Sequence, residues 1–245
     1  MKDRFKGPVM TRRGQVEGGS ATDQRLLDSR GPADWVHTDP WRVLRIQSEF
    51  VEGFGALAEI GPAIGVFGSA RTKTEHPDYA RAEQVGRRLA EEGFAVITGG
   101  GPGAMEAANR GAREAGALSI GLNIDLPFEH GRAHEWVDRS LDFHYFFTRK
   151  VMFVRYANAF VALPGGFGTF DELFEALCLI QTEKIRSFPL ILVGTEYWSG
   201  LVDWLLQTVA AEGKIAAGDL DLLHTTDDLD AVVEIVLGAA VGQGV

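Results

Sequence analysis

Short apolar runs recur along the chain, and longer stretches with mixed apolar and polar residues separate them. Runs of this length that lack polar alternation are typical of strands buried on both faces of a sheet. The pattern predicts such strands over residues 64–67, 95–98, 117–122, 159–163 and 190–193.

The stretches between these strands show the spacing of amphipathic helices. The clearest follows Pro77, ends before Gly93 and repeats apolar residues every three or four positions. Further helices are predicted over 104–115, 144–157, from 173 onward, 198–211 and 228–237, the last preceded by a short apolar run at 222–224. Alternating strands and helices indicate βαβ units. The fold class predicted is therefore α/β, a Rossmann-like doubly wound and mainly parallel sheet with helices on both faces.

The N-terminal region differs from the rest. Residues 1–36 are rich in Gly, Arg, Asp and Ser without a sustained period, which predicts a flexible tail. Thr38-Asp39-Pro40 resembles a helix start, and apolar residues then recur from Trp41 to Leu57. We expect residues 37–62 to form a helical extension that covers a sheet edge or meets another subunit. Residues 63–245 then form one Rossmann-like domain.

Composition narrows the function classes. The chain has 245 residues and a formal net charge of -10, which disfavours non-specific binding of nucleic acid or anionic membranes. It has no apolar run as long as a membrane helix and no secretory signal at its start. Its one cysteine, Cys178, excludes an internal disulfide and a cysteine-based zinc site, and its apolar surroundings predict a buried structural thiol. The histidines lack metal-ligand spacing, so no metal is expected. These features together predict a cytoplasmic protein.

Glycines cluster directly after three of the predicted strands, as Gly68-Ser69, Gly99–Gly103 and Gly165–Gly168. Because the carboxyl ends of parallel strands meet at one edge, we expect these loops to border a single ligand cleft. Neither the dinucleotide fingerprint nor the P-loop of nucleoside triphosphatases is present. A smaller phosphate ligand such as a nucleoside monophosphate fits the loops, although each alone is also compatible with an ordinary tight turn.

The third loop carries the most chemistry. Pro164–Glu172 lies between a buried strand and a helix, where glycines and helix N–H groups form an anion site. Glu172 then lies near enough to act on the rest of a ligand whose phosphate binds at this site. Thr169 and Glu172 also have the spacing of a capping box, which would make Glu172 a helix cap instead.

Four other charged residues are candidates for ligand binding. Arg149 and Lys150 are cations that suit a phosphate or carboxylate, or else belong to a solvated helix face. Glu106 follows the second glycine loop and suits ribose hydroxyls, or simply favours the first turn of a helix. Glu129 lies in a loop, where the alternative is a solvated carboxylate.

Together these motifs resemble the LOG ("Lonely Guy") family of cytokinin riboside 5′-monophosphate phosphoribohydrolases. The resemblance rests on Arg149-Lys150, on Pro164–Glu172 as P-G-G-x-G-T-x-x-E, on Thr98–Gly111, and on Gly68-Ser69 and Leu126–Glu129. It extends from about Ile64 to about Val193, so the N-terminal extension lies outside it. Phe170-Asp171 stands where the signature often has Leu-Glu.

The resemblance implies hydrolysis of the N-glycosidic bond of an N6-modified adenosine 5′-monophosphate or of AMP, giving a free base and ribose 5-phosphate without a cofactor. It implies Arg149 and Glu172 as catalytic residues. The positions that it implies for substrate binding are Gly68, Ser69, Gly100, Gly101, Met105, Glu129, Lys150, Gly165, Gly166, Phe167, Gly168, Thr169 and Asp171.

Two further expectations accompany the resemblance. The family was long labelled as lysine decarboxylases, but that reaction needs pyridoxal phosphate on a lysine, and Lys150 has no suitable context. The alternative function is a non-catalytic nucleotide or molybdenum-cofactor carrier of the same fold. The resemblance also suggests a homo-oligomer, either a dimer or a hexamer built of dimers.

Overall fold

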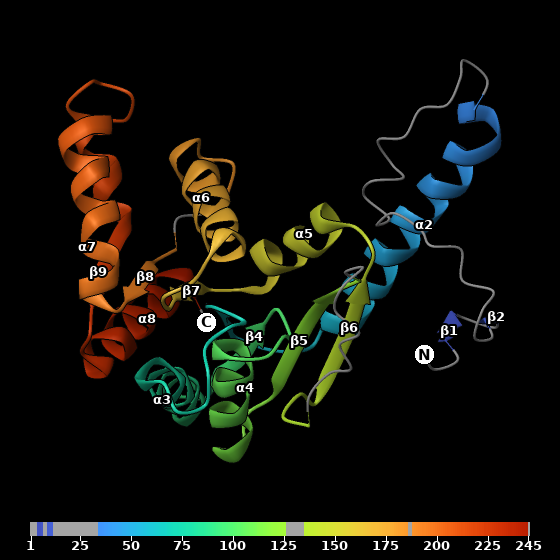
Figure 1. Cartoon of the computed structure of the whole chain (residues 1–245), viewed down its shortest axis with the longest axis horizontal. Coiled ribbons are helices and arrows are strands. Elements are labelled where there is room, and N and C mark those ends of the chain that lie inside the picture. Colours follow the sequence, from blue (N-terminus) through green and yellow to red (C-terminus); the bar gives the residue numbers. More distant parts are fainter. Residues whose placement is uncertain (1–3, 7–8, 12–33, 126–134, 186–187, 245) are drawn as a thin grey trace.

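Seven parallel strands form the central sheet in the computed structural model, which describes residues 4–6, 9–11, 34–125, 135–185 and 188–244. The sheet order is β6-β5-β4-β3-β7-β8-β9, so the chain builds outward from β3 in one direction and then in the other (Figure 1). This is the doubly wound, Rossmann-like architecture predicted from the sequence. The strands are β3 (Ala63–Phe67), β4 (Ala95–Thr98), β5 (Ser119–Ile124), β6 (Arg139–Phe143), β7 (Ala159–Ala162), β8 (Leu190–Val193) and β9 (Leu223–Thr226).

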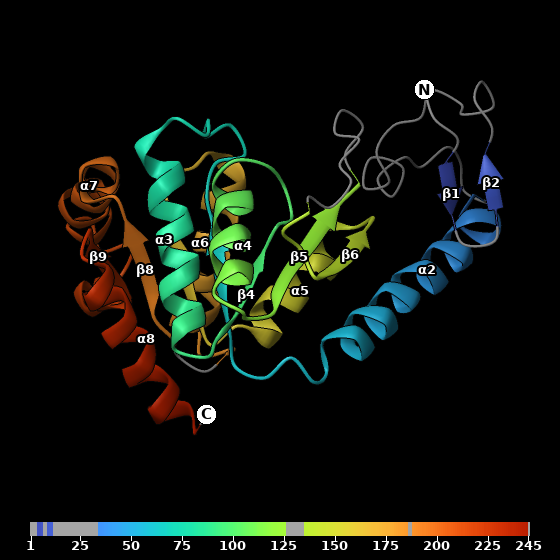
Figure 2. The same ribbon diagram turned by 90° about the horizontal axis from the view of Figure 1, so that it is seen from below.

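Helices cover both faces of this sheet (Figure 2). Successive strand side chains point to opposite faces. Phe67 and Phe160 therefore belong to one apolar core, together with residues of α5 (Phe146–Tyr156), α6 (Phe167–Gln181) and α7 (Thr195–Trp204). Val66 and Val161 belong to the other, with residues of α3 (Pro77–Glu91), α4 (Ala104–Glu114) and α8 (Leu229–Gln243). The predicted continuous apolar runs are thus explained by burial on both faces. Between α7 and β9 lie a π-helical turn, η1 (Leu205–Ala210), and a 3-10 segment, η2 (Ala217–Leu222).

The two outermost strands, β6 and β9, were not predicted. Both lie at the sheet edges, where one side of the strand has no neighbour. Apart from Phe143, their side chains are partly buried or exposed, and in β6 the inward and outward positions alternate. An edge strand of this kind has no continuous apolar run to mark it, although the alternation in Arg139–Phe143 was an available signal.

Helices α3 and α4 lie side by side with their backbones unusually close (Figure 2). A Cβ atom added to Gly86 would lie 2.0 Å from the carbonyl oxygen of Ala108, and one added to Gly111 would lie 1.9 Å from that of Glu83. The absence of a side chain at both positions therefore sets the spacing between these helices. This packing orients the N-terminus of α4 toward the sheet edge where the second glycine loop lies.

The N-terminal extension begins earlier than predicted. Helix α2 runs over Asp34–Leu57 with Pro40 inside it, so the start predicted at Thr38 was wrong. Its C-terminal half packs on the domain while its other end extends away beyond β6 (Figure 2). Within the predicted tail, β1 (Arg4–Lys6) pairs antiparallel with β2 (Val9–Thr11), so these residues form a two-stranded ribbon.

Cys178 corrects another expectation, because its side chain is exposed on α6 and not buried. The immediate neighbours of Cys178 are apolar, but at helical spacing it lies on the same side as Asp171, Glu175 and Thr182, opposite the buried Leu173, Ala176 and Ile180, so the periodicity was an available signal. Of the helices in the described ranges, none is both long and apolar enough to span a bilayer.

Candidate active site

The candidate site is a cleft of about 1540 Å³ at the carboxyl edge of the sheet, where the strand order reverses between β3 and β7. Ligands of open α/β sheets bind at such a switch point. All three glycine loops line the cleft, as predicted. The predicted site residues on its wall are Gly68, Ser69, Gly100, Gly101, Met105, Arg149, Gly165, Gly166, Phe167, Gly168, Thr169 and Glu172, together with Glu106. Glu129 lies outside the described residues.

The glycine turn after β7 leads directly into α6, whose first residue is Phe167. A Cβ atom on Gly165 would lie 2.1 Å from the hydroxyl oxygen of Thr169, so the turn closes only with glycine there. The first N–H groups of a helix have no partner within the helix, and its dipole places partial positive charge at that end. The N-terminus of α6 is therefore suited to hold a phosphate at the wall of the cleft.

The capping-box interpretation of Thr169 and Glu172 is wrong for this helix. The N-cap residue is Gly166, and no side chain caps the helix start. Thr169 and Glu172 both lie inside α6, where Glu172 is a turn too far along the helix to reach the N-cap. Its carboxylate is thus available for another role.

Glu172 is buried against the cleft beside the guanidinium of Arg149. Its side chain is 3% exposed, and Oε1 lies 3.6 Å from Nη2 of Arg149, too far for a hydrogen bond. No described residue donates a hydrogen bond to either carboxylate oxygen. Burial raises the pKa of Glu172 to about 7, against the opposing charges of Arg149 and Lys150. A carboxylate in this state exchanges protons near neutral pH, which suits a general acid or base.

Arg149 reaches the cleft from the first turn of α5. Its guanidinium carbon lies 5.0 Å from the ring centre of Phe146 and 5.8 Å from that of Phe153. Cations over aromatic faces gain electrostatic attraction, and the planar guanidinium packs well on such rings. The two rings therefore hold the cation in place next to Glu172.

Lys150 and Asp171 do not line the cleft but pair with each other beside it. The ammonium group of Lys150 lies 2.9 Å from Asp171 and 2.9 Å from Glu175. Burial alone would lower the pKa of Lys150, but the hydrogen bonds to Asp171 and Glu175 outweigh it and raise that pKa. A lysine that forms a Schiff base needs a depressed pKa. This environment therefore disfavours a decarboxylase role for Lys150.

The loop after β4 is held by a buried polar network that the sequence did not reveal. Asn109 accepts a hydrogen bond from Thr98 at 2.5 Å and donates to Ser119 at 2.8 Å, while the hydroxyl of Thr98 accepts from the N–H of Gly100 at 3.0 Å. Gly100 has φ of 67°, and a Cβ atom there would lie 1.8 Å from Oδ1 of Asn123. Glycine is thus required at the point where this loop faces the cleft.

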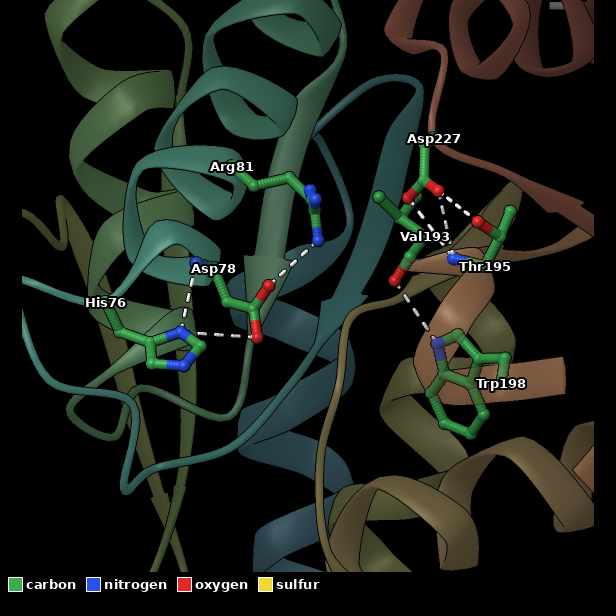
Figure 3. Close-up of polar contacts among 7 residues, drawn as sticks. All are labelled: His76, Asp78, Arg81, Val193, Thr195, Trp198 and Asp227. Atoms are coloured by element: carbon green, nitrogen blue, oxygen red, sulfur yellow. Dashed lines mark hydrogen bonds and ion pairs between the residues drawn. The ribbon is translucent and has the colours of Figure 1, made fainter. Parts of the chain in front are cut away.

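Other side chains that sequence reasoning missed support the remaining loops. His76 accepts a hydrogen bond from the N–H of Asp78 and caps α3, and Asp78 pairs with Arg81 at 2.8 Å (Figure 3). His76 and Asp78 both line the cleft. Histidine is an uncommon N-cap, so only Pro77 marked this helix start.

The turn after β8 is fastened to the glycine turn after β7. The hydroxyl of Tyr197 donates to the carbonyl oxygen of Gly165 at 2.6 Å. Trp198 donates to the carbonyl oxygen of Val193 at 3.2 Å, and Asp227 accepts from Thr195 at the start of α7 (Figure 3). Among the described residues, no group of three or more His, Cys, Asp or Glu side chains is arranged to hold a metal ion.

Comparison with known proteins identifies the family. A family model described as "possible lysine decarboxylase" matches residues 105–236, more than half of the chain. This chain belongs to that family, the LOG family. The match includes Arg149 and the glycine turn of α6, and it ends in α8.

Named relatives of this LOG family member act on nucleotides. A cytokinin riboside 5′-monophosphate phosphoribohydrolase of Mycobacterium marinum is 28% identical over 65% of this chain and 86% of its own. A pyrimidine/purine nucleotide 5′-monophosphate nucleosidase of Escherichia coli K12 is 28% identical over 56% of this chain and 33% of its own. Among solved structures, the molybdenum cofactor carrier protein of Chlamydomonas reinhardtii is 26% identical, with a TM-score of 0.52 over 72% of this chain and 98% of that one.

Proposed function

We propose that this chain hydrolyses the N-glycosidic bond of a nucleoside 5′-monophosphate, giving a free base and ribose 5-phosphate. The substrate we favour is AMP or an N6-modified AMP, the cytokinin riboside monophosphate of the named relatives. The single observation that carries the proposal is the buried carboxylate of Glu172, with its pKa raised to about 7, beside Arg149 and about one turn inside the helix that the glycine turn opens.

The chemistry follows from this arrangement. The phosphate binds at the N-terminus of α6 and fixes the ribose, so that C1′ lies near Glu172. As the bond from C1′ to the base nitrogen breaks, positive charge develops on the ribose, and the carboxylate stabilises it. Glu172 takes a proton from water as the water oxygen bonds to C1′, and it then returns that proton through solvent to the departing base, which restores the carboxylate. Arg149 keeps the carboxylate of Glu172 in position beside C1′.

The alternative is a carrier that binds a nucleotide or the molybdenum cofactor without cleaving it. The likeness to the Chlamydomonas carrier supports it. So does the size of the cleft, which exceeds the roughly 300–1,000 Å³ of most small-molecule pockets. The two functions differ in one measurable respect, the appearance of free base.

The test is to incubate the purified chain with AMP and, separately, with N6-isopentenyladenosine 5′-monophosphate, and to follow free base by chromatography. Base is expected from at least one nucleotide, and the ratio of the two rates gives the base preference. Binding of both nucleotides in calorimetry with no base from either would reject the hydrolase and favour the carrier.

We also propose that the chain forms a homo-oligomer, either a dimer or a hexamer of three dimers. The outer face of α2 supports this, because Trp41, Leu44 and Val51 are 64%, 54% and 72% exposed. Large apolar side chains gathered on one helix face are typical of an interface. Sedimentation velocity is expected to give a mass of at least two chains, and a monomer at micromolar concentration would contradict the proposal.

A further inference from the structure

The strongest cluster of titratable side chains outside the cleft centres on Glu49 of α2. Its side chain is buried, and Oε1 accepts a hydrogen bond from the N–H of His144 at 2.8 Å and lies 2.9 Å from Nδ1 of the same residue. Oε2 accepts a hydrogen bond from the hydroxyl of Thr148 at 2.6 Å. Burial alone would raise the pKa of Glu49, but these bonds outweigh it and lower that pKa. Glu49 therefore presents a negative charge inside the protein.

The partners of Glu49 flank the start of α5. His144 lies two residues before the helix begins, and Thr148 is the third residue of its first turn. The N-cap residue, Tyr145, makes no side-chain capping bond. Acceptors and negative charges stabilise the N-terminal end of a helix, where N–H groups and partial positive charge accumulate. Glu49 thus places a negative charge beside the start of α5 and ties it to α2 through His144 and Thr148, where Tyr145 supplies no side-chain cap.

Further contacts hold α2 against α5 along the same face. A Cβ atom on Gly53 would lie 2.8 Å from the sulfur of Met152, so the two helices meet closely there. The hydroxyl of Tyr156 donates to the carbonyl oxygen of Phe54 at 3.1 Å. The C-terminal half of α2 therefore contacts α5 along the whole length of α5, from Thr148 in its first turn to Tyr156 at its end.

Arg149 follows Thr148 directly, so the turn that Glu49 fixes also carries the proposed catalytic cation. We propose that Glu49 is a positioning residue, which makes the N-terminal helix part of the catalytic apparatus by orienting the first turn of α5. This inference rests on the proposed function. Because Arg149 lies 3.6 Å from Glu172 and is not hydrogen-bonded to it in this structure, a small shift of the turn alters their separation directly.

The test compares Glu49→Ala and Glu49→Gln with Glu52→Gln, a matched control that removes a carboxylate from an exposed position of the same helix. Glu49→Ala is expected to lower kcat about ten- to a hundredfold, because small misplacements of catalytic groups cost that much. Glu49→Gln retains an acceptor for the N–H of His144, so its kcat is expected to fall only about threefold below that of the wild type. KM should stay within about twofold of the wild type in every variant, because the phosphate site on α6 is unchanged.

Amide hydrogen exchange gives a second readout that does not need catalysis. Faster exchange confined to the first turns of α5 in both Glu49 variants, with α6 unchanged, supports the positioning role. Wild-type kcat and exchange in both Glu49 variants would overturn it, and so would faster exchange throughout the sheet. If the wild type releases no base, the proposed function fails, and exchange alone then decides whether Glu49 orders α5.

Discussion

Replacing Glu172 with glutamine is expected to reduce base release from AMP at least about a thousandfold while AMP still binds. The loss combines general-base catalysis, worth about 10²–10⁴-fold, with electrostatic stabilisation of the ribose cation. Glutamine has nearly the same shape but neither accepts a proton near neutral pH nor carries a charge. Rates come from chromatography of free base, and binding comes from calorimetry with the variant.

A matched control lies one turn further along α6. Glu175→Gln removes a carboxylate that pairs with Lys150 outside the cleft, and a change in kcat of less than about fivefold is expected, as for a partly exposed ion pair. If Glu175→Gln lowers kcat as much as Glu172→Gln does, the loss of activity reflects the overall charge of α6 and not the action of Glu172 at C1′.

The pH dependence of the wild type follows from the same residue. As a general base, Glu172 must be ionised in the free enzyme, and its pKa is about 7. We therefore expect kcat/KM to rise with pH and to level off above an apparent pKa near 7. A falling limb through the same range would assign Glu172 the role of a proton donor instead.

The second large effect of the same substitution is on stability, which is expected to rise although activity is lost. Glu172→Gln is expected to stabilise the fold at pH 8 by about 2 kcal/mol, because a raised carboxyl pKa means that the folded state binds the proton more tightly than the unfolded state. The wild type loses this stability as pH rises from 4.5, the pKa of an unperturbed glutamate, to about 7, where the buried carboxylate ionises. The uncharged glutamine has no such loss.

Denaturant unfolding of both proteins at pH 5 and pH 8 measures this difference. Glu172→Gln should have a higher free energy of unfolding than the wild type at pH 8, and at pH 5 this difference should fall to less than half of its value at pH 8. Equal stability of the two proteins at pH 8 would mean that the charge of Glu172 is better compensated in the fold than its burial indicates. A stabilising mutation that abolishes activity is the expected behaviour of a catalytic group held in an unfavourable environment.

The central elements were predictable because their signals are local. Strands β3, β4, β7 and β8 are buried on both faces, so each is a continuous apolar run, and three glycine loops follow strands of one parallel sheet. Parallel topology alone then brings these loops to one edge. The edge strands β6 and β9 lack a run of that length, because most of their side chains stay partly or fully exposed on the faces of the sheet.

Misassigned residues share a different cause. Cys178 has apolar neighbours in sequence but polar neighbours, Asp171 and Glu175, on its own side of the helix. Thr169 and Glu172 match a cap only if the helix begins at Thr169. Thr38-Asp39-Pro40 likewise has the local form of a helix start, yet α2 already runs through it. In each case a short motif was compatible with two arrangements, and packing selected one.

By itself the sequence determined the alternation of the central strands and helices and the edge of the sheet where the glycine loops meet, and it pointed to Arg149 and Glu172, which both line the cleft. Only the tertiary structure decided that Glu172 is buried with a raised pKa, that Lys150 pairs with Asp171 beside the cleft, and that Glu49 bonds to His144 and Thr148 at the start of α5. The physical reason is the distance along the chain over which each property is set. Backbone conformation responds to neighbours a few positions away, whereas burial and charge depend on contacts such as that between Glu49 and His144, which are 95 residues apart.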